Sequence, residues 1–232
     1  MSGNPVEPCP FKKNGTQYGF FAMIDRMRWI RRWSLMRNAN DENLAEHSLL
    51  VAIIGHALGI IRNLGWALNE TELKKQKQVN PEAIAVRAMF HDATEIITGD
   101  LPTPVKYHDP GLRDAYRRVE KAAEKRLLSF LPEGMQAVYE PLLTQSEESR
   151  ELDRFVKAAD VLTAYIKCAQ EVEAGNGEFR QALAQTRARV EAIELPECSF
   201  FLNHFCDGFT ASLDELNNQV GKHDGDSEAF NC

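Results

Sequence analysis

A cluster of polar side chains interrupts an otherwise apolar helical run at residues 88–100. Buried polar groups without partners cost roughly 1 to 3 kcal/mol each, and charged groups cost more, so His91 and Asp92 require hydrogen-bonding partners or a metal ion. Glu95 follows His91 by four residues and Asp92 by three, which would put all three side chains on one helical face. The stretch therefore predicts a site in which three functional groups point into one small volume.

The His-Asp dipeptide is a weak signal by itself, because the chain contains it three times. The copy at His108 precedes Pro-Gly and is typical of a helix start, with the aspartate as N-cap. The copy at His223 lies in a polar C-terminal segment. Only the copy at His91 lies within an apolar periodic segment. We therefore favour a catalytic or metal-binding role for His91 and Asp92 over a core pair satisfied by hydrogen bonds.

Length and composition predict one soluble domain. A chain of 232 residues with 44% hydrophobic content can bury a sizeable core. The net charge of −7 argues against non-specific binding to nucleic acid polymers or membrane surfaces, which favour basic proteins. A signal-peptide pattern and a run of 18 apolar residues are both absent, so we expect no membrane segment and a cytoplasmic location. Five scattered cysteines without a C-x-x-C pair favour free thiols.

Apolar spacing predicts helices along the chain and no strand. A basic amphipathic helix is expected at 20–33, with Arg32 and Trp33 at its end. Further helices are expected at 43–63, 81–98, 109–131, 132–143 and 147–174, with two more between 177 and 217. Pro102 and Pro104 make 100–106 a loop. We interpret 1–17 as a flexible lead-in, 66–80 as a polar surface excursion, and 218–232 as a disordered tail, which leaves one domain at 18–217.

Inward-facing polar residues of three predicted helices form a candidate metal-ligand set. His47 lies near the start of its helix, whereas His56 faces the opposite way. Asp160 interrupts an apolar stripe, so we expect it to be buried and paired with a metal or an arginine. The predicted ligands are His47, His91, Asp92 and Asp160. Nitrogen and oxygen ligands together suit cobalt, manganese, zinc or iron, and a six-coordinate ion would keep two positions open for water and substrate. The chain has no Glu-x-x-His pair, which excludes a di-iron bundle.

Several longer strings resemble the YfbR-type 5′-deoxynucleotidases of the HD-domain phosphohydrolase superfamily. The strings are RWSLMRN at 32–38, EHSL at 46–49, HDATE at 91–95, TGDLPTPVK at 98–106, KAAD at 157–160 and AGN at 174–176. The resemblance covers 20–215 and departs from the family pattern at Ser34, where proline is expected, and at 66–80. It implies an all-α HD-domain helical bundle in a single domain, a homodimer, one divalent cation, and hydrolysis of deoxyribonucleoside 5′-monophosphates to deoxyribonucleoside and phosphate.

The resemblance and the helical register together predict roles for individual side chains. Glu95 is expected to handle a proton as base or acid, and Arg32 to clamp the phosphate. Trp33 is expected to form a rigid wall that excludes a 2′-hydroxyl. The predicted catalytic residues are Glu95, Arg32 and Asp100. The predicted substrate-binding residues are Arg32, Trp33, Asp100, Leu101, Pro102, Thr103 and Asp160.

Two other functions fit the same residues. An HD-type phosphodiesterase or triphosphohydrolase acting on another nucleotide would need the same ligands. A non-catalytic nucleotide-binding regulator would use the metal only structurally, but Glu95 beside open metal positions argues against it. The sequence leaves the preferred base and the metal open.

Overall fold

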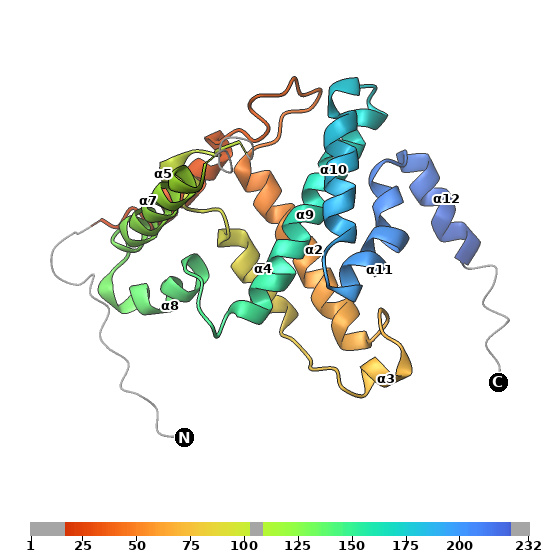
Figure 1. Ribbon diagram of the computed structural model, residues 1–232, viewed down its shortest axis with the longest axis horizontal. Helices are drawn as coiled ribbons and strands as arrows, with labels where there is room; N and C mark the ends of the chain where they lie inside the picture. Colours follow the sequence, from red (N-terminus) through yellow and green to blue (C-terminus); the bar gives the residue numbers. More distant parts are fainter. Residues whose placement is uncertain (1–16, 103–108, 224–232) are drawn as a thin grey trace.

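The computed structural model describes residues 17–102 and 109–223, and over these ranges the chain forms helices joined by loops, without a strand (Figure 1). The predicted all-α fold is confirmed. The elements are α1 (Phe20–Asp25), η2 (Arg26–Trp29), α2 (Leu44–Leu64), α3 (Glu70–Leu73), α4 (Pro81–Phe90), α5 (Glu95–Thr98), α7 (Pro110–Leu128), α8 (Glu133–Leu143), α9 (Arg150–Glu173), η3 (Gly177–Phe179), α10 (Arg180–Glu191), α11 (Pro196–Phe205), η4 (Cys206–Phe209) and α12 (Leu213–His223).

Two glycines allow α2 and α4 to pack closely. A Cβ atom at Gly55 would lie 3.0 Å from Cγ2 of Ile84, and one at Gly59 would lie 3.1 Å from Cα of Pro81. Gly55 meets Ile84, whereas Gly59, later in α2, meets Pro81, earlier in α4, so the two helices run antiparallel. The same pairing brings the start of α2, with His47, to the end of α4, where His91 follows. Close packing in the core thus sets the positions of both histidines.

The third helix of the main core is α9, which packs against both α2 and α4 (Figure 1). Its buried side chains join a cluster with Val51, Leu58 and Ile84. A second cluster forms around Phe20, which stacks on Phe90 and meets the Tyr139 ring edge-on. It joins α1, α7 and α8 and includes the fully buried Ala93, which anchors the turn after α4. The two clusters therefore hold the polar turn from opposite sides.

The predicted helix at 20–33 is wrong in its second half. The α-helix ends at Asp25, and a 3₁₀ turn follows as far as Trp29. Arg32 N then donates to Glu42 O (3.0 Å), and Leu44 N donates to Ile30 O (2.9 Å). These hydrogen bonds hold the segment in an extended pairing with the entry to α2. Arg32 and Trp33 therefore lie in a loop and not at a helix end.

The predicted helix at 81–98 is interrupted at the polar cluster. α4 ends at Phe90, residues 91–94 form turns, and α5 begins at Glu95. Ala93 N bonds to Phe90 O (3.0 Å), and Glu95 N bonds to Asp92 O (2.9 Å), so the chain tightens from α-type to 3₁₀-type bonding. Gly99 ends α5 with φ of 73° and ψ of 160°, a conformation that glycine adopts far more readily than other residues.

Two further segments that we expected to lack helices contain helical residues. Residues 66–80 include the short helix α3, which Asn69 caps. The last helix, α12, runs to His223 and so enters the segment that we expected to be disordered from 218. Helix α2 is long and apolar enough to cross a membrane, but 56% of its most apolar window is buried inside the protein, as in the core helix of a soluble protein.

Candidate metal centre

Two imidazoles and a carboxylate converge where α2, α4 and α9 meet. Potential ligand atoms of His47, His91 and Asp160 all lie within 4.8 Å of one another. Nε2 of His47 is 3.2 Å from Oδ1 of Asp160, and the two imidazole rings have centroids 5.4 Å apart. The structure thus brings together three of the four residues that the sequence suggested as ligands.

The fourth predicted ligand, Asp92, lies beside the other three. Its Oδ2 atom is 3.0 Å from Nε2 of His91 and 3.9 Å from Nε2 of His47. Asp92 follows the last residue of α4 by two positions, so the end of that helix directs its carboxylate towards the start of α2. All four predicted ligands therefore share one small volume.

The buried nitrogen atoms of this cluster fit a metal ion. Neither ring nitrogen of His47 makes a hydrogen bond, although the residue is 1% exposed, and Nε2 of His91 also makes none. Nδ1 of His91 lies 2.7 Å from the carbonyl oxygen of Ala88. A proton on Nδ1 would satisfy that carbonyl and turn the Nε2 lone pair to the cluster, which is the usual arrangement of a metal-binding histidine. The donor set suits a divalent first-row ion.

The charges of the cluster favour a bound cation. Burial lowers the pKa of His91, but the charge and hydrogen bond of Asp92, together with the Asp160 carboxylate and the Ala88 carbonyl, outweigh burial and raise the pKa to about 9. Burial raises the pKa of Asp92, but the charge and hydrogen bond of His91, together with the charge of His47, outweigh burial and lower the pKa to about 2. The pKa of Asp160 is also lowered, against burial, by His47 and Lys157. A metal ion can replace the proton that these carboxylates draw onto the imidazoles.

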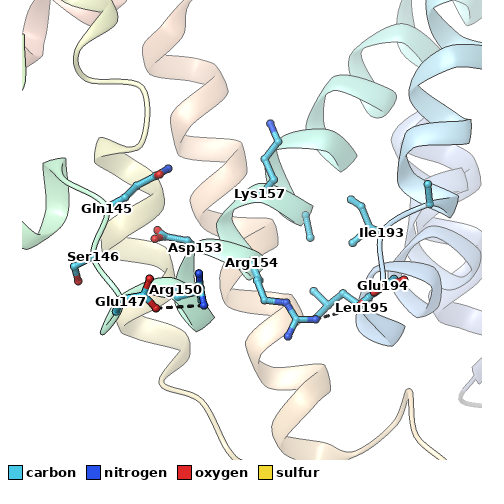
Figure 2. Close-up of a pocket in the computed structure, with 12 residues that line it drawn as sticks. Gln145, Ser146, Glu147, Arg150, Asp153, Arg154, Lys157, Ile193, Glu194 and Leu195 are labelled. Atoms are coloured by element: carbon cyan, nitrogen blue, oxygen red, sulfur yellow. Dashed lines mark hydrogen bonds and ion pairs between the residues drawn. The ribbon is translucent and has the colours of Figure 1, made fainter. Parts of the chain in front are cut away.

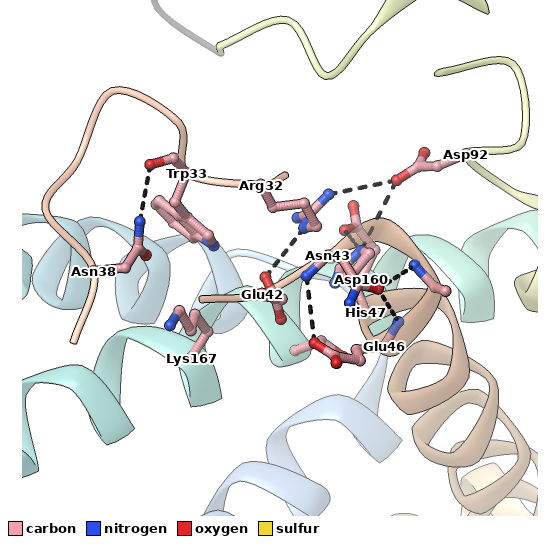
Figure 3. A network of polar contacts seen from close by, with 12 residues as sticks. Arg32, Trp33, Asn38, Glu42, Asn43, Glu46, His47, Asp92, Asp160 and Lys167 are labelled. Atoms are coloured by element: carbon pink, nitrogen blue, oxygen red, sulfur yellow. Dashed lines mark hydrogen bonds and ion pairs between the residues drawn. The ribbon is translucent and has the colours of Figure 1, made fainter. Parts of the chain in front are cut away.

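Arg32 reaches the edge of the cluster from the loop before α2 (Figure 3). Its Nε atom is 3.2 Å from Oε2 of Glu42, and one terminal nitrogen is 3.6 Å from Oδ2 of Asp92. The side chain is only 12% exposed. Burial opposes its charge, but Asp160, Glu42 and Asp92 outweigh burial and raise the arginine pKa. Arg32 therefore presents a fixed positive charge beside the predicted metal ligands.

Trp33 has the strained backbone that often marks a functional site. Its φ is +54°, the one positive value among the non-glycine residues that the structure describes. The indole Nε1 atom is buried without a hydrogen-bond partner, and the ring packs against Phe179 with centroids 5.5 Å apart. The sequence singled out Trp33 together with Arg32, but its positive φ could not be predicted from the sequence.

Glu95 and Asp100, which follows α5, are close enough to the cluster for its charges to act on both carboxyl groups. Oε2 of Glu95 is buried without a hydrogen bond. Burial, then the Asp92 and Asp100 carboxylates, raise the Glu95 pKa to about 9. Burial also raises the pKa of Asp100. Leu101 and Pro102 are partly buried, and Thr103 lies outside the described residues.

Sequence reasoning missed two charged residues at this site. Glu42 was not among the predicted site residues, yet it pairs with Arg32. Lys157 donates to Oδ2 of Asp160 at 2.7 Å, at i,i+3 spacing along α9. That spacing to a predicted ligand was a usable signal. For Glu42 the signal was absent, because its contact depends on the extended pairing of 30–32 with 42–44.

A cavity of about 890 Å³ opens beside the first half of α9, away from the metal ligands (Figure 2). Ion pairs within its wall include Arg150 with Glu147. Lys157 lines this cavity and also contacts Asp160, so it lies between the cavity and the metal cluster. None of the predicted ligands lines the cavity.

The fold resembles that of solved HD-domain phosphohydrolases. An HD-domain phosphohydrolase from Listeria innocua has a TM-score of 0.68 at 23% identity, over 88% of this chain and 97% of that one. A cyanophage S-2L HD phosphohydrolase, solved with dA and one catalytic Zn²⁺ ion, has a TM-score of 0.52 at 18% identity, over 83% of this chain and 99% of that one.

The sequence matches are narrower. The family described as 5′-deoxynucleotidase YfbR-like matches residues 19–209. A 5′-deoxynucleotidase of Photorhabdus temperata is 46% identical over 197 residues, which make up 85% of this chain and 95% of the relative. One of Vibrio atlanticus is 44% identical over 86% of this chain and 98% of the relative. The chain belongs to the YfbR-like 5′-deoxynucleotidase family.

We expect substitutions of the cluster to remove bound metal. His47→Ala, His91→Ala, Asp92→Ala and Asp160→Ala each delete a donor from a small buried set, so elemental analysis of the purified variants should find most of the metal gone. His56→Ala is the matched control, because His56 lies on the same helix away from the cluster, and it should keep the parent metal content. Full metal in the Asp160 variant would remove that residue from the ligand set.

Proposed function

We infer that the protein is a metal-dependent 5′-deoxynucleotidase that hydrolyses deoxyribonucleoside 5′-monophosphates to deoxyribonucleoside and phosphate. The observation that carries this inference is the buried cluster of two imidazoles and two carboxylates beside the Arg32 guanidinium. Family membership supports the same activity and substrate class. His47, His91, Asp92 and Asp160 would hold the cation, which is cobalt, manganese, zinc or iron.

The bound cation would supply Lewis-acid polarisation of a phosphate oxygen and a lower pKa for water at its open positions. The side chains of this protein perform the remaining tasks. Arg32 has a planar fork of donors that matches two phosphate oxygens, and Glu42 and Asp92 fix its direction. Glu95 would exchange a proton with the attacking water or the leaving 5′-oxygen. Asp100 stands on the same side and would help to orient that exchange.

The substrate would extend from the cluster towards the loop of residues 33–40. Trp33 would form the wall against the sugar, and Leu101 and Pro102 would contact the nucleoside, as would Thr103, which lies outside the described residues. A 2′-hydroxyl pressed against an indole ring would lose its hydrogen bonds to water, at a cost of roughly 1 to 3 kcal/mol. This would favour deoxyribose by roughly ten- to a hundredfold.

A phosphate-release screen tests the activity and the role of Glu95 together. The metal-loaded parent should release phosphate from dAMP and other deoxyribonucleoside monophosphates, and chelation should abolish the release. Glu95→Gln should keep its metal and still bind nucleotide, but it should lose about 10² to 10⁴-fold in kcat, because it removes the group that transfers the proton. Turnover above about a tenth of the parent rate would exclude that role. Preference for di- or triphosphates, or for phosphodiesters, would point to the other HD-type activities.

Trp33 and Arg32 should have separable effects on kcat/KM. Trp33→Ala should lower the ratio of kcat/KM for dAMP to kcat/KM for AMP, because the wall against the 2′-hydroxyl is gone. Arg32→Ala should lower kcat/KM for both substrates alike, and Arg32→Lys should be nearly as damaging, because lysine cannot form the bidentate contact. An unchanged sugar ratio in the Trp33 variant would leave that residue a packing role only.

We further propose that the protein is a cytoplasmic homodimer. The resemblance to the family implied this state, and an exposed apolar stripe along α2 supports it. Leu49, Ile53, Ile60 and Leu64 recur at helical spacing and are between 38% and 57% exposed. Such a stripe on a soluble protein commonly marks an interface. A second copy with the same stripe could cover it through a two-fold axis.

Sedimentation should detect this dimer and its loss. Ile53→Glu places a charge in the centre of the stripe and should shift the protein to a monomer at micromolar concentration. Val138→Glu is the matched control, because Val138 is 67% exposed on α8, and it should leave the dimer intact. A monomeric parent, or a dimeric Ile53 variant, would contradict the proposed interface.

A further inference from the structure

A buried carboxylate on α9 holds the loop that follows Trp33. Glu171 is 0% exposed and accepts hydrogen bonds from the backbone N–H groups of Ala39 (2.8 Å) and Asn40 (3.0 Å). Nδ2 of Asn176 donates to the same carboxylate at 2.7 Å, and Lys167 also donates to it. Four donors thus converge on one side chain, and two of them belong to the loop.

The ammonium group of Lys167 strengthens this attachment. It donates to the carbonyl oxygen of Asn40 as well as to Glu171. Asn176 in turn donates to the carbonyl oxygen of Arg37 at 2.7 Å. Burial opposes ionisation of Glu171, but the hydrogen bonds from Lys167 and from the loop outweigh it and lower its pKa to about 2. A buried ion pair is a weak source of stability by itself, so its hydrogen bonds to the loop are its more informative feature.

The same cluster extends to the ring of Trp33. The indole packs on Phe179, which is fully buried, and the Lys167 ammonium lies 5.7 Å from the Phe179 ring centroid. The carbonyl oxygen of Trp33 accepts from Nδ2 of Asn38 at 3.2 Å, inside the held loop (Figure 3). A residue with φ of +54° keeps that conformation only when its surroundings enforce it. The contacts with α9 and η3 supply this enforcement.

We propose that Glu171 is a positioning residue for substrate selection: it fixes residues 37–40 to α9 and thereby keeps the Trp33 wall in place. Glu171 touches neither the predicted metal ligands nor Arg32 and acts through the loop. This inference rests on the proposed function, in which Trp33 excludes the 2′-hydroxyl. It adds a second layer to that function: the chemistry depends on Asp160 and the sugar preference on Glu171, about three helical turns further along the same face of α9.

The first test compares two buried glutamates. Glu171→Gln removes the charge that holds the loop. Glu197→Gln is the matched control, because Glu197 is equally buried and pairs with Arg62, far along the chain from the loop. With metal-loaded protein, Glu171→Gln should lower the ratio of kcat/KM for dAMP to kcat/KM for AMP about tenfold, mainly through a higher kcat/KM for AMP, with unchanged metal content. Glu197→Gln should leave the ratio at the parent value. An unchanged ratio in the Glu171 variant would overturn the proposal.

A second variant guards against simple misfolding. Asn176→Ala keeps the buried Lys167–Glu171 pair but removes the bonds to the carbonyl oxygen of Arg37 and to Glu171. It should also lower the ratio of kcat/KM for dAMP to kcat/KM for AMP, by a smaller factor than Glu171→Gln does. Two results would show that the change in Glu171→Gln reflects stability alone and would overturn the proposal. One is a parent-like dAMP to AMP ratio in Asn176→Ala, and the other is a fall of that ratio in Glu197→Gln as large as in Glu171→Gln.

A spectroscopic readout separates this proposal from the proposed function. In a Trp29→Phe, Trp66→Phe background, Trp33 is the remaining tryptophan of the chain. Acrylamide should quench Trp33 fluorescence more strongly when Glu171→Gln is added to this background. Adding Glu197→Gln should leave the quenching as it is in the background protein. Unchanged quenching in the Glu171 variant would contradict the attachment, even if the parent hydrolyses dAMP. A parent without sugar preference, but with increased quenching in the Glu171 variant, would instead overturn only the selection role.

Discussion

The fold as a whole depends on a cluster of imidazoles and carboxylates that is buried where three helices of an apolar core meet. Both ring nitrogens of His47 and Nε2 of His91 are buried without hydrogen bonds, at the point where α2, α4 and α9 pack together. Their placement depends on the close approach at Gly55 and Gly59, since bulkier residues there would push α4 away from α2. A core that is tightly packed at one end thus holds a polar, reactive cluster at the other.

The break between α4 and α5 follows from the same cluster. A continuous helix would keep Asp92 and Glu95 in regular register, but the turns at 91–94 let both carboxylates approach the imidazoles from one side. The backbone hydrogen bonds lost from the helix are replaced by i→i+3 bonds and by the contact of His91 Nδ1 with the Ala88 carbonyl. Ala93, fully buried against the Phe20 cluster, keeps the turns in place.

Sequence patterns predicted the features that depend on local periodicity. The helical class, the approximate extent of α2 and α9, and the meeting of His47, His91 and Asp160 were all readable, because each depends on apolar spacing within a helix. The loop position of Arg32 and Trp33 was not readable. It depends on hydrogen bonds between residues 30–32 and 42–44, which no local pattern encodes. Lys167 and Glu171 could be recognised from the sequence as an i,i+4 ion pair, because their neighbours Ile166, Cys168 and Val172 are apolar. The loop residues that bind this pair could not be recognised.

The balance of charge suggests an order of binding. Asp92, Asp160 and Glu42 surround Arg32, and Glu95 and Asp100 face the same volume. A phosphate monoester carries about two negative charges near neutral pH, so the Asp92 and Asp160 carboxylates would repel it from a cluster that holds only protons, whereas Glu95, with its pKa raised to about 9, would carry no charge. Occupation of the cluster by a divalent ion would reverse the local potential, while Glu42 and Asp92 keep the Arg32 guanidinium in place. Metal binding would then be a condition for substrate binding as well as for chemistry.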